Sequence, residues 1–91
     1  MPLSPKQKNL LSYRASDVKW HLGYDYWDIM REMEADTSVH QIDLNELVGY
    51  VMFLNKRVGT ECTEIEFAQN KEKLKDLLNR YKERKTYSEN N

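Results

Sequence analysis

Apolar residues recur every three or four positions along most of the chain, a spacing that places them on one side of an α-helix. In the first such segment they are Leu11, Ala15, Val18 and Leu22. Ser4 comes directly before Pro5, and Gln7 follows three residues after Ser4, an arrangement that caps a helix start. We therefore expect a helix from Pro5 to about Leu22, ended by Gly23 in a left-handed conformation.

A short second helix is expected from about Asp25 to Ala35. Its apolar side is formed by Tyr26, Ile29, Met30 and Met33. A helix this short depends on packing against its neighbours. Residues 36–42 are interpreted as a loop, which Val39 and Ile42 attach to the core.

A third helix is expected from Leu44 to Val58, with Asp43 as its capping residue and Gly59 ending it. Its predicted core side consists of Leu44, Val48, Val51 and Val58, while Tyr50 and Phe53 look the other way. A helix that is apolar almost all round is usually buried, so we expect this one to be central.

Residues 47–54 contain no charge, so a buried strand is the competing interpretation for this segment. The cap at Asp43 and the stop at Gly59 favour the helix. Gly49 lies inside it and costs about 1 kcal/mol relative to Ala. We interpret this glycine as the mark of a close helix crossing.

The last helix is expected from Glu64 to about Lys85, with Thr63 and Glu66 forming its capping box. Its apolar stripe consists of Phe67, Leu74, Leu77, Leu78 and Tyr81. Residues 86–91 are expected to fray. The sequence thus predicts a single all-α domain over residues 1–91, a small bundle of four helices with the third central and a longer, charged C-terminal helix.

Composition narrows the classes of protein to which the chain can belong. Its 91 residues allow one small domain, and its single Cys excludes a disulfide scaffold and a four-Cys zinc site. No apolar run approaches the roughly 20 residues that span a bilayer, so no membrane partner is expected. Because no apolar leader stands near the start, we expect a cytoplasmic protein.

No pattern of residues points to catalysis or to a bound cofactor. Cys62 is far in the sequence from His21 and His40, and no metal-ligand spacing joins the three. The acidic residues between 25 and 36 lack the Gly-centred pattern of a calcium loop, and the sequence has no Gly-rich phosphate loop. We therefore expect a protein that is not an enzyme and that holds no metal and no cofactor.

The formal net charge of −1 hides an uneven distribution of charge. Residues 1–24 carry four bases against one acid, residues 25–46 seven acids against one base, and residues 71–85 seven bases against three acids. Packing of oppositely charged helices within the domain is one interpretation, and recognition of a charged partner is the other. The bases of the last helix are interpreted as a solvated face or, alternatively, as contacts for nucleic acid or an acidic partner. These candidate contacts are Lys71, Lys75, Arg80, Lys82 and Arg84.

The segment from Trp20 to Trp27 holds four of the ten aromatic residues of the chain. One interpretation is that these rings fill the junction between the first two helices. The other is an exposed contact for a protein partner, because Trp and Tyr are enriched at such sites. Tyr13 and Trp20 lie opposite the apolar side of the first helix, so they need a partner either within the chain or outside it. The candidate partner-binding residues are Tyr13, Trp20, Tyr24 and Trp27.

The order of helix caps and core residues resembles that of a known family. The motifs are Pro5-x-Gln7-x-x-Leu10-Leu11, then Leu22-Gly23 with a short helix led by Tyr and Trp, then Leu44-x-Glu46-Leu47, Leu54 and Val58-Gly59. Over residues 4–59 this order looks like the GemA regulators of Mu-like phages. The first helix is about one turn longer here, and a charged fourth helix stands in place of the family's later segment rich in Trp, Leu and Gly. The resemblance implies a phage-type accessory protein acting on host or viral machinery, and it carries over no catalytic residue.

Taken together, these features favour a non-enzymatic module that binds another protein, as a phage or prophage regulator or assembly factor. One alternative is a nucleic-acid-binding protein that uses Lys6, Lys8 and the bases of the last helix. Another is a self-associating structural subunit, a homo-oligomer whose contact is formed by Phe67, Leu74 and Tyr81, which are seven residues apart.

Overall fold

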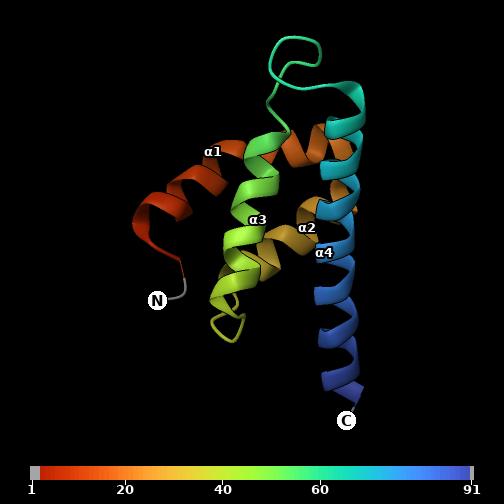
Figure 1. Ribbon diagram of the computed structural model, residues 1–91. Helices are drawn as coiled ribbons and strands as arrows, with labels where there is room; N and C mark the ends of the chain where they lie inside the picture. Colours follow the sequence, from red (N-terminus) through yellow and green to blue (C-terminus); the bar gives the residue numbers. More distant parts are fainter. Residues whose placement is uncertain (1–2, 91) are drawn as a thin grey trace.

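The computed structural model describes residues 3–90, of which residues 88–90 are described by their backbone only, and it folds them into four helices. They are α1 (Pro5–Leu22), α2 (Tyr24–Ala35), α3 (Gln41–Phe53) and α4 (Glu64–Asn90), as Figure 1 shows. The predicted all-α fold is confirmed. Residues 47–53 are helical, so the competing strand interpretation of that segment is wrong.

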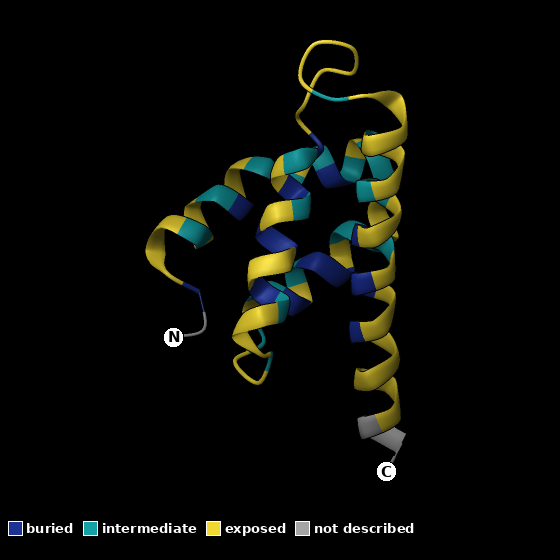
Figure 2. Cartoon of the chain, viewed as in Figure 1, coloured by how far each residue is buried: buried dark blue, intermediate teal, exposed yellow. Residues whose placement is uncertain are grey.

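A single core is built from side chains of all four helices. α1 packs against α2 and α3, and α4 packs against the same two helices. Figure 2 shows the buried positions on the inward sides of the helices and the exposed positions outside. The buried side chains are Leu3, Leu11, Val18, Ile29, Met30, Met33, Leu44, Leu47, Val48, Val51, Leu54, Leu74, Leu77, Leu78 and Tyr81. The apolar sides predicted for the first, second and fourth helices therefore face this core.

The third helix begins earlier than predicted, at Gln41 and not at Leu44. The reason is the cap: the His40 imidazole Nδ1 accepts a hydrogen bond from the backbone N–H of Ile42 at 3.2 Å. His40 thus takes the place predicted for Asp43. The Asp43 carboxylate falls in the first turn of α3, where the positive end of the helix dipole favours it.

The same helix also ends earlier than predicted, at Phe53 and not at Val58. Residues 54–56 each donate a backbone hydrogen bond to the carbonyl three residues before them, and such tight turns end an α-helix. Val58 is consequently exposed in the loop and lies outside the core. Gly59 has a positive φ of 95°, but it lies in the loop and does not end α3. Its N–H donates to the Cys62 carbonyl at 2.7 Å.

Although α3 lies between α1 and α4 (Figure 1), one of its sides faces solvent. Ile42 is exposed on that side and does not attach the loop to the core, whereas Val39 packs against the core as predicted. Gly49 is also exposed, and a Cβ added there would meet nothing within 4 Å. The close helix crossing predicted at this glycine is therefore wrong. Tyr50, expected to look away from the core, packs against it half-buried.

The two other predicted capping boxes are confirmed. At the start of α1, Ser4 Oγ accepts from the Gln7 N–H and Gln7 Oε1 accepts from the Ser4 N–H, both at 3.1 Å. At the start of α4, Thr63 Oγ1 accepts from the Glu66 N–H at 3.0 Å, and Glu66 Oε1 accepts from the Thr63 N–H at 3.3 Å. Each pair satisfies two backbone donors that a helix start leaves without partners.

α4 is longer than predicted and continues to Asn90, so residues 86–90 prolong the helix; Asn91 lies outside the described residues. Figure 1 shows the C-terminal part of α4 running past the other helices. Leu74 and Tyr81 are buried inside the chain, and Phe67 is packed against the same core. The homo-oligomer contact predicted for these three residues is therefore wrong, because the chain itself covers them.

Gly23 ends α1 and begins α2 with no further residue between them. Its N–H donates to the Lys19 carbonyl at 3.1 Å, and its carbonyl accepts from the Trp27 N–H at 3.2 Å. Its φ of 95° is positive as predicted, but its ψ of 173° places it in an extended region that is essentially confined to glycine. This single residue holds the end of α1 against the start of α2, where the aromatic residues gather.

Candidate protein-interaction surface

The side of α1 that faces away from the bundle carries two large exposed aromatic side chains. Tyr13 is 76% exposed and Trp20 is 85% exposed. Because they are seven residues apart, or about two turns, both lie on the same side of the helix. Leu11 and Val18, on the opposite side, are buried. The spacing of the apolar residues in α1 had placed both rings here.

The exposed surface between these two rings is uncharged, and it is bordered by Lys6, seven residues before Tyr13, and by the Arg14 guanidinium, 5.1 Å from the centroid of the Tyr13 ring. It consists of five exposed residues, here called the outer stripe: Asn9, Ser12, Tyr13, Ser16 and Trp20. Of all residues in the chain, 32% are charged, so five uncharged neighbours on one helix face stand out. Depletion of charge with enrichment of aromatic residues is the composition found at the centre of protein–protein interfaces. The small serines beside the rings leave room for the side chains of a partner.

Tyr24 and Trp27, at the start of α2, have different surroundings from the outer stripe. The Lys19 ammonium lies 5.6 Å from the centroid of the Tyr24 ring and 5.0 Å from that of the Trp27 ring, within the range of cation–π attraction. The Arg31 guanidinium lies 6.0 Å from the Trp27 ring. Tyr24 is 70% exposed, whereas Trp27 is half-buried and packs against the core. Trp27 thus fills the helix junction, while Tyr24 extends the exposed aromatic surface.

A charged edge borders this surface where α1 meets α2. The Glu34 side chain is only 7% exposed, and its Oε2 lies 3.1 Å from Arg31 Nη1. Burial raises the pKa of Glu34, an effect that Arg31 and then Lys8 oppose through Coulomb attraction. Lys8 and Arg31 thus act on the Glu34 carboxyl, and Lys19 and Arg31 lie near the Trp27 ring, so three bases line this edge.

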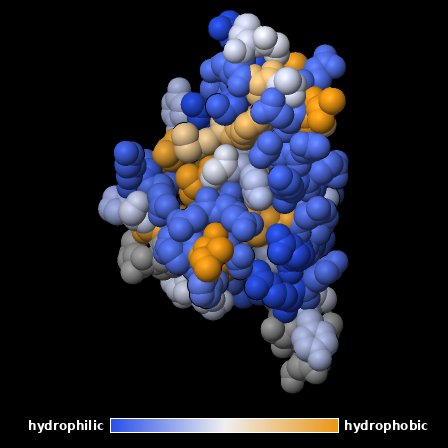
Figure 3. All heavy atoms as spheres, in the orientation of Figure 1, coloured by the Kyte–Doolittle hydropathy of each residue, from blue (hydrophilic) through white to orange (hydrophobic). Residues whose placement is uncertain are grey.

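Other exposed apolar side chains are scattered over the molecule. Ile42 and Met52 lie on the outer side of α3, Val58 lies in the loop after it, and Ile65 lies at the start of α4. The face drawn in Figure 3 is mostly hydrophilic, and its small apolar patches are separated by polar residues. The outer stripe and Tyr24 are therefore the most concentrated group of large exposed rings among the described side chains.

The basic residues of α4 do not form one face of the helix. Helical spacing places Lys71, Lys75 and Lys82 on one flank and Lys73, Arg80 and Arg84 on the other. Between the flanks, the outward side of α4 carries Glu72, Asp76 and Glu83. Lys75 Nζ lies 3.5 Å from Glu72 Oε1, and Arg80 Nε donates to the Asp76 carbonyl at 3.4 Å. The residues predicted to contact nucleic acid are thus divided by a ridge of acids.

The basic start of the chain also lies apart from α4. In Figure 1, α3 stands between the N-terminal half of α1, which carries Lys6 and Lys8, and α4. A protein that binds nucleic acid usually presents its bases as one patch or stripe. The structure does not bring the two basic segments together in that way.

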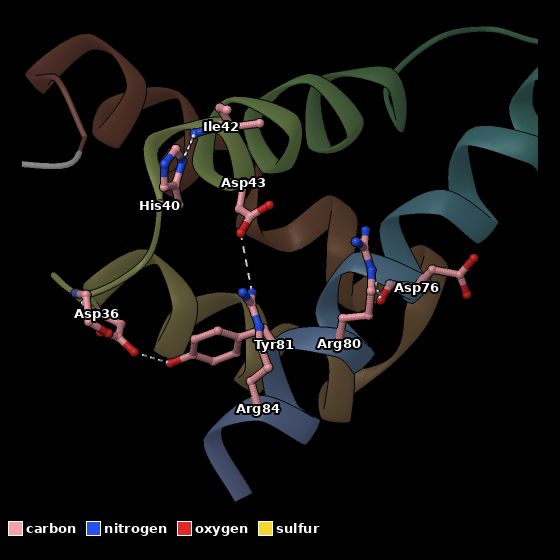
Figure 4. Close-up of polar contacts among 9 residues, drawn as sticks. Asp36, His40, Ile42, Asp43, Asp76, Arg80, Tyr81 and Arg84 are labelled. Atoms are coloured by element: carbon pink, nitrogen blue, oxygen red, sulfur yellow. Dashed lines mark hydrogen bonds and ion pairs between the residues drawn. The ribbon is translucent and has the colours of Figure 1, made fainter. Parts of the chain in front are cut away.

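Two ion pairs instead join α4 to the acidic middle of the described chain. Arg84 Nη2 lies 3.4 Å from Asp43 Oδ2, and Lys85 Nζ lies 3.3 Å from Asp36 Oδ2. Figure 4 shows Arg84 pointing from α4 toward Asp43 at the start of α3. These contacts support the interpretation that the uneven charge of the sequence serves packing within the domain.

Asp36, at the end of α2, is the centre of a polar cluster that the sequence analysis missed. Its Oδ1 accepts hydrogen bonds from the Ser38 N–H at 2.9 Å and the Ser38 hydroxyl at 2.6 Å, and its Oδ2 accepts from the Tyr81 hydroxyl at 2.8 Å. These bonds, those of Ser38 first, hold the pKa of Asp36 well below its usual range. Burial, and next the bond to Asp36, raise the pKa of Tyr81. An Asp two residues before a Ser is the local signal that indicates such a turn.

A hollow of about 300 Å³ opens beside this cluster. It is lined by Asp36, Ser38, Val39, His40, Tyr81, Arg84 and Lys85. Asp36, Arg84 and Lys85 already have charged or hydrogen-bonding partners within the chain, as described above. We therefore interpret the cluster as the anchor of the α2–α3 loop on α4.

No family model matches the chain, and its comparison with curated proteins and with solved structures gives no match. Within residues 3–90, no helix is both long and apolar enough to cross a membrane. A search of the same residues finds no group of three or more His, Cys, Asp or Glu placed to hold a metal ion. The exposed aromatic surface of α1 and α2 is therefore the candidate functional site.

Proposed function

We propose that this protein is a non-enzymatic interaction module that binds another protein through the outer stripe of α1 and Tyr24. The observation that carries the proposal is the 85% exposure of Trp20 on the outer side of a folded helix. Exposing so large an apolar ring to water is unfavourable, and covering it with a partner recovers that free energy. Trp and Tyr are also the residues that most often dominate the binding energy of protein interfaces.

We propose further that the chain is a phage or prophage accessory protein that acts in the cytoplasm on host or viral machinery. This part rests on the sequence motifs over residues 4–59 that resemble those of the GemA regulators, of which Val58 and Gly59 lie in the loop after α3 and not in the helix. The small size of the domain and its exposed aromatic rings are compatible with a protein that works by contact alone.

A pull-down from the native host tests the proposal with Trp20→Ala. Because the side chain is exposed, the substitution should change the free energy of unfolding by no more than about 0.5 kcal/mol. We expect the variant to lose the proteins that the wild type captures, and to keep its far-UV circular dichroism. The lysate is treated with nuclease in a parallel sample, so that capture through nucleic acid is recognised.

Ile65→Ala is the matched control, because Ile65 is 70% exposed and belongs to α4 and not to the outer stripe. It should capture the same proteins as the wild type. Equal capture by the wild type and Trp20→Ala, with the fold intact, would remove the outer stripe from the proposed function. Loss of capture after nuclease treatment would favour the nucleic-acid alternative.

A further inference from the structure

We propose that the partner seated on the outer stripe is a second copy of this chain, bound through an antiparallel pair of α1 helices. This inference rests on the proposed function, because it names the occupant of the same surface. Three properties of the described residues support it: the area of the exposed rings, the position of the small serines, and the distribution of charge along α1 and α2.

The area of the exposed rings fits the requirement of a symmetric dimer. A buried aromatic side chain contributes about 150–250 Å², so Tyr13, Trp20 and Tyr24 together offer roughly 500 Å². A stable interface buries about 800 Å² on each partner. Asn9, Ser12 and Ser16 lie between or beside the rings and can supply much of the remainder.

The small residues of the outer stripe favour an antiparallel arrangement. If the two-fold axis passes by Ser16, this residue meets its own copy, and two small side chains let the helices approach closely. The same arrangement places Trp20 of one copy against Ser12 of the other, a large ring beside a small side chain. In a parallel pair, Trp20 would meet Trp20 and Tyr13 would meet Tyr13, with the serines left in a gap.

Charge favours the same arrangement. The N-terminal half of α1 carries Lys6 and Lys8, both exposed, and α2 begins with the exposed acids Asp25 and Asp28. In an antiparallel pair, the basic start of one α1 lies beside the start of the other copy's α2, where the acids Asp25 and Asp28 outnumber the one lysine, Lys19, in the last turn of α1. A parallel pair would place the lysines of both copies together. Opposite charges at the edges of a contact select partner and orientation.

The first experiment measures the molar mass of the purified chain by sedimentation equilibrium as a function of concentration. We expect the wild type to change from monomer to dimer with rising concentration, and Trp20→Ala to weaken the dimer by roughly thirtyfold, as a central aromatic contact does. Ile65→Ala should dimerise like the wild type. A wild type that stays monomeric up to about 1 mM, or dimers that Trp20→Ala does not weaken, would overturn the proposal.

A charge exchange then tests the antiparallel arrangement. One variant carries Lys6→Glu and Lys8→Glu, and the other carries Asp25→Lys and Asp28→Lys. Each alone should dimerise at least about tenfold more weakly than the wild type, because like charges face each other at both edges. Mixed in equal amounts, they should form a heterodimer near wild-type strength, since both edges become complementary again. Failure of the mixture to recover, with both variants folded by circular dichroism, would overturn the antiparallel pair.

The two proposals can fail separately. A monomeric wild type whose pull-down still depends on Trp20 would leave the proposed function standing and overturn the dimer. A Trp20-dependent dimer that captures no other protein confirms the second copy as the occupant and limits the proposed function to self-association. A monomer without Trp20-dependent capture would remove both.

Discussion

Gly49 lies in the interior of α3 on the side that faces solvent, with open space where a Cβ would be. Its φ is not positive, so alanine fits its conformation. We expect Gly49→Ala to raise the free energy of unfolding by about 0.5–1 kcal/mol, because glycine loses more backbone freedom on folding than alanine does. The midpoint of urea unfolding measures this effect, with an unchanged slope showing that the folded state is the same.

Gly23→Ala is the matched contrast, since the same change there forces a side chain into a positive φ of 95°. That variant should be less stable than the wild type, and no close neighbour contributes to the loss. A lower midpoint for Gly49→Ala would show that α3 needs the glycine for a reason that its surroundings do not reveal.

At the scale of the elements, the loop between α2 and α3 is attached to α4 by Asp36. Because hydrogen bonds lower the pKa of Asp36 in the folded chain, its contribution to stability is fully present above the pKa of about 3.9 of an unfolded Asp. That contribution is lost as the pH falls through the lower pKa of the folded state. We expect Asp36→Asn to be less stable than the wild type at pH 7, and this difference to shrink as the pH is lowered from about 5 toward 2.

Urea unfolding at several pH values measures the difference in stability between the wild type and Asp36→Asn. Tyr81→Phe is measured as a second variant. This variant keeps the ring in the core but removes the hydroxyl that donates to Asp36 at 2.8 Å. Its pH dependence should lie between those of the wild type and Asp36→Asn. A difference between wild type and Asp36→Asn that stays constant from pH 7 to pH 2 contradicts this account.

Helix starts could be predicted from the sequence where the capping chemistry is local. Ser4 and Thr63 each accept a hydrogen bond from a residue three positions away, so these two capping boxes can be predicted from the local sequence alone. The start of α3 could not be predicted in this way, because both His40 and Asp43 have side chains that can cap a helix. The outcome depends on the loop held by Asp36 and Tyr81, which are 45 residues apart. No local pattern contains such a contact.

For the candidate surface too, local spacing predicted some positions, and others depended on contacts between distant parts of the chain. Periodicity alone put Tyr13 and Trp20 on the outer side of α1, and their exposure in the folded chain agrees with it. Trp27 could not be placed in that way, because its burial depends on the turn at Gly23 and on contacts with Lys19 and Arg31. The split of the α4 bases into two flanks was readable from helical spacing, but their pairing with the acidic segment required the fold.

At the scale of the whole molecule, all four helices share one core. A substitution that leaves a cavity in this core should therefore destabilise all four helices, whichever helix carries it. Leu77 of α4 is almost completely buried. We expect Leu77→Ala to lower the free energy of unfolding by about 2–5 kcal/mol, which is a large part of the roughly 5–14 kcal/mol available to a domain of this size. Far-UV circular dichroism and Trp fluorescence should report a single transition with the same midpoint.

For comparison, Ile65→Ala removes an exposed side chain from the same helix and should shift the midpoint very little. Separate midpoints for helix content and Trp fluorescence in Leu77→Ala would mean that α4 unfolds apart from the α1–α2 junction, and the single shared core would be refuted.

The junction at Gly23 also bears on which changes of chain length this fold tolerates. One added residue there would turn every following position of α2 by about 100°. Met30 and Met33 would leave the core, and part of the acidic side of α2 would enter it. The loop between α3 and α4 is longer and largely exposed, so additions there displace only solvent. Homologues of this chain should therefore vary in length after α3 and keep the spacing from Ser4 to Ala35 fixed.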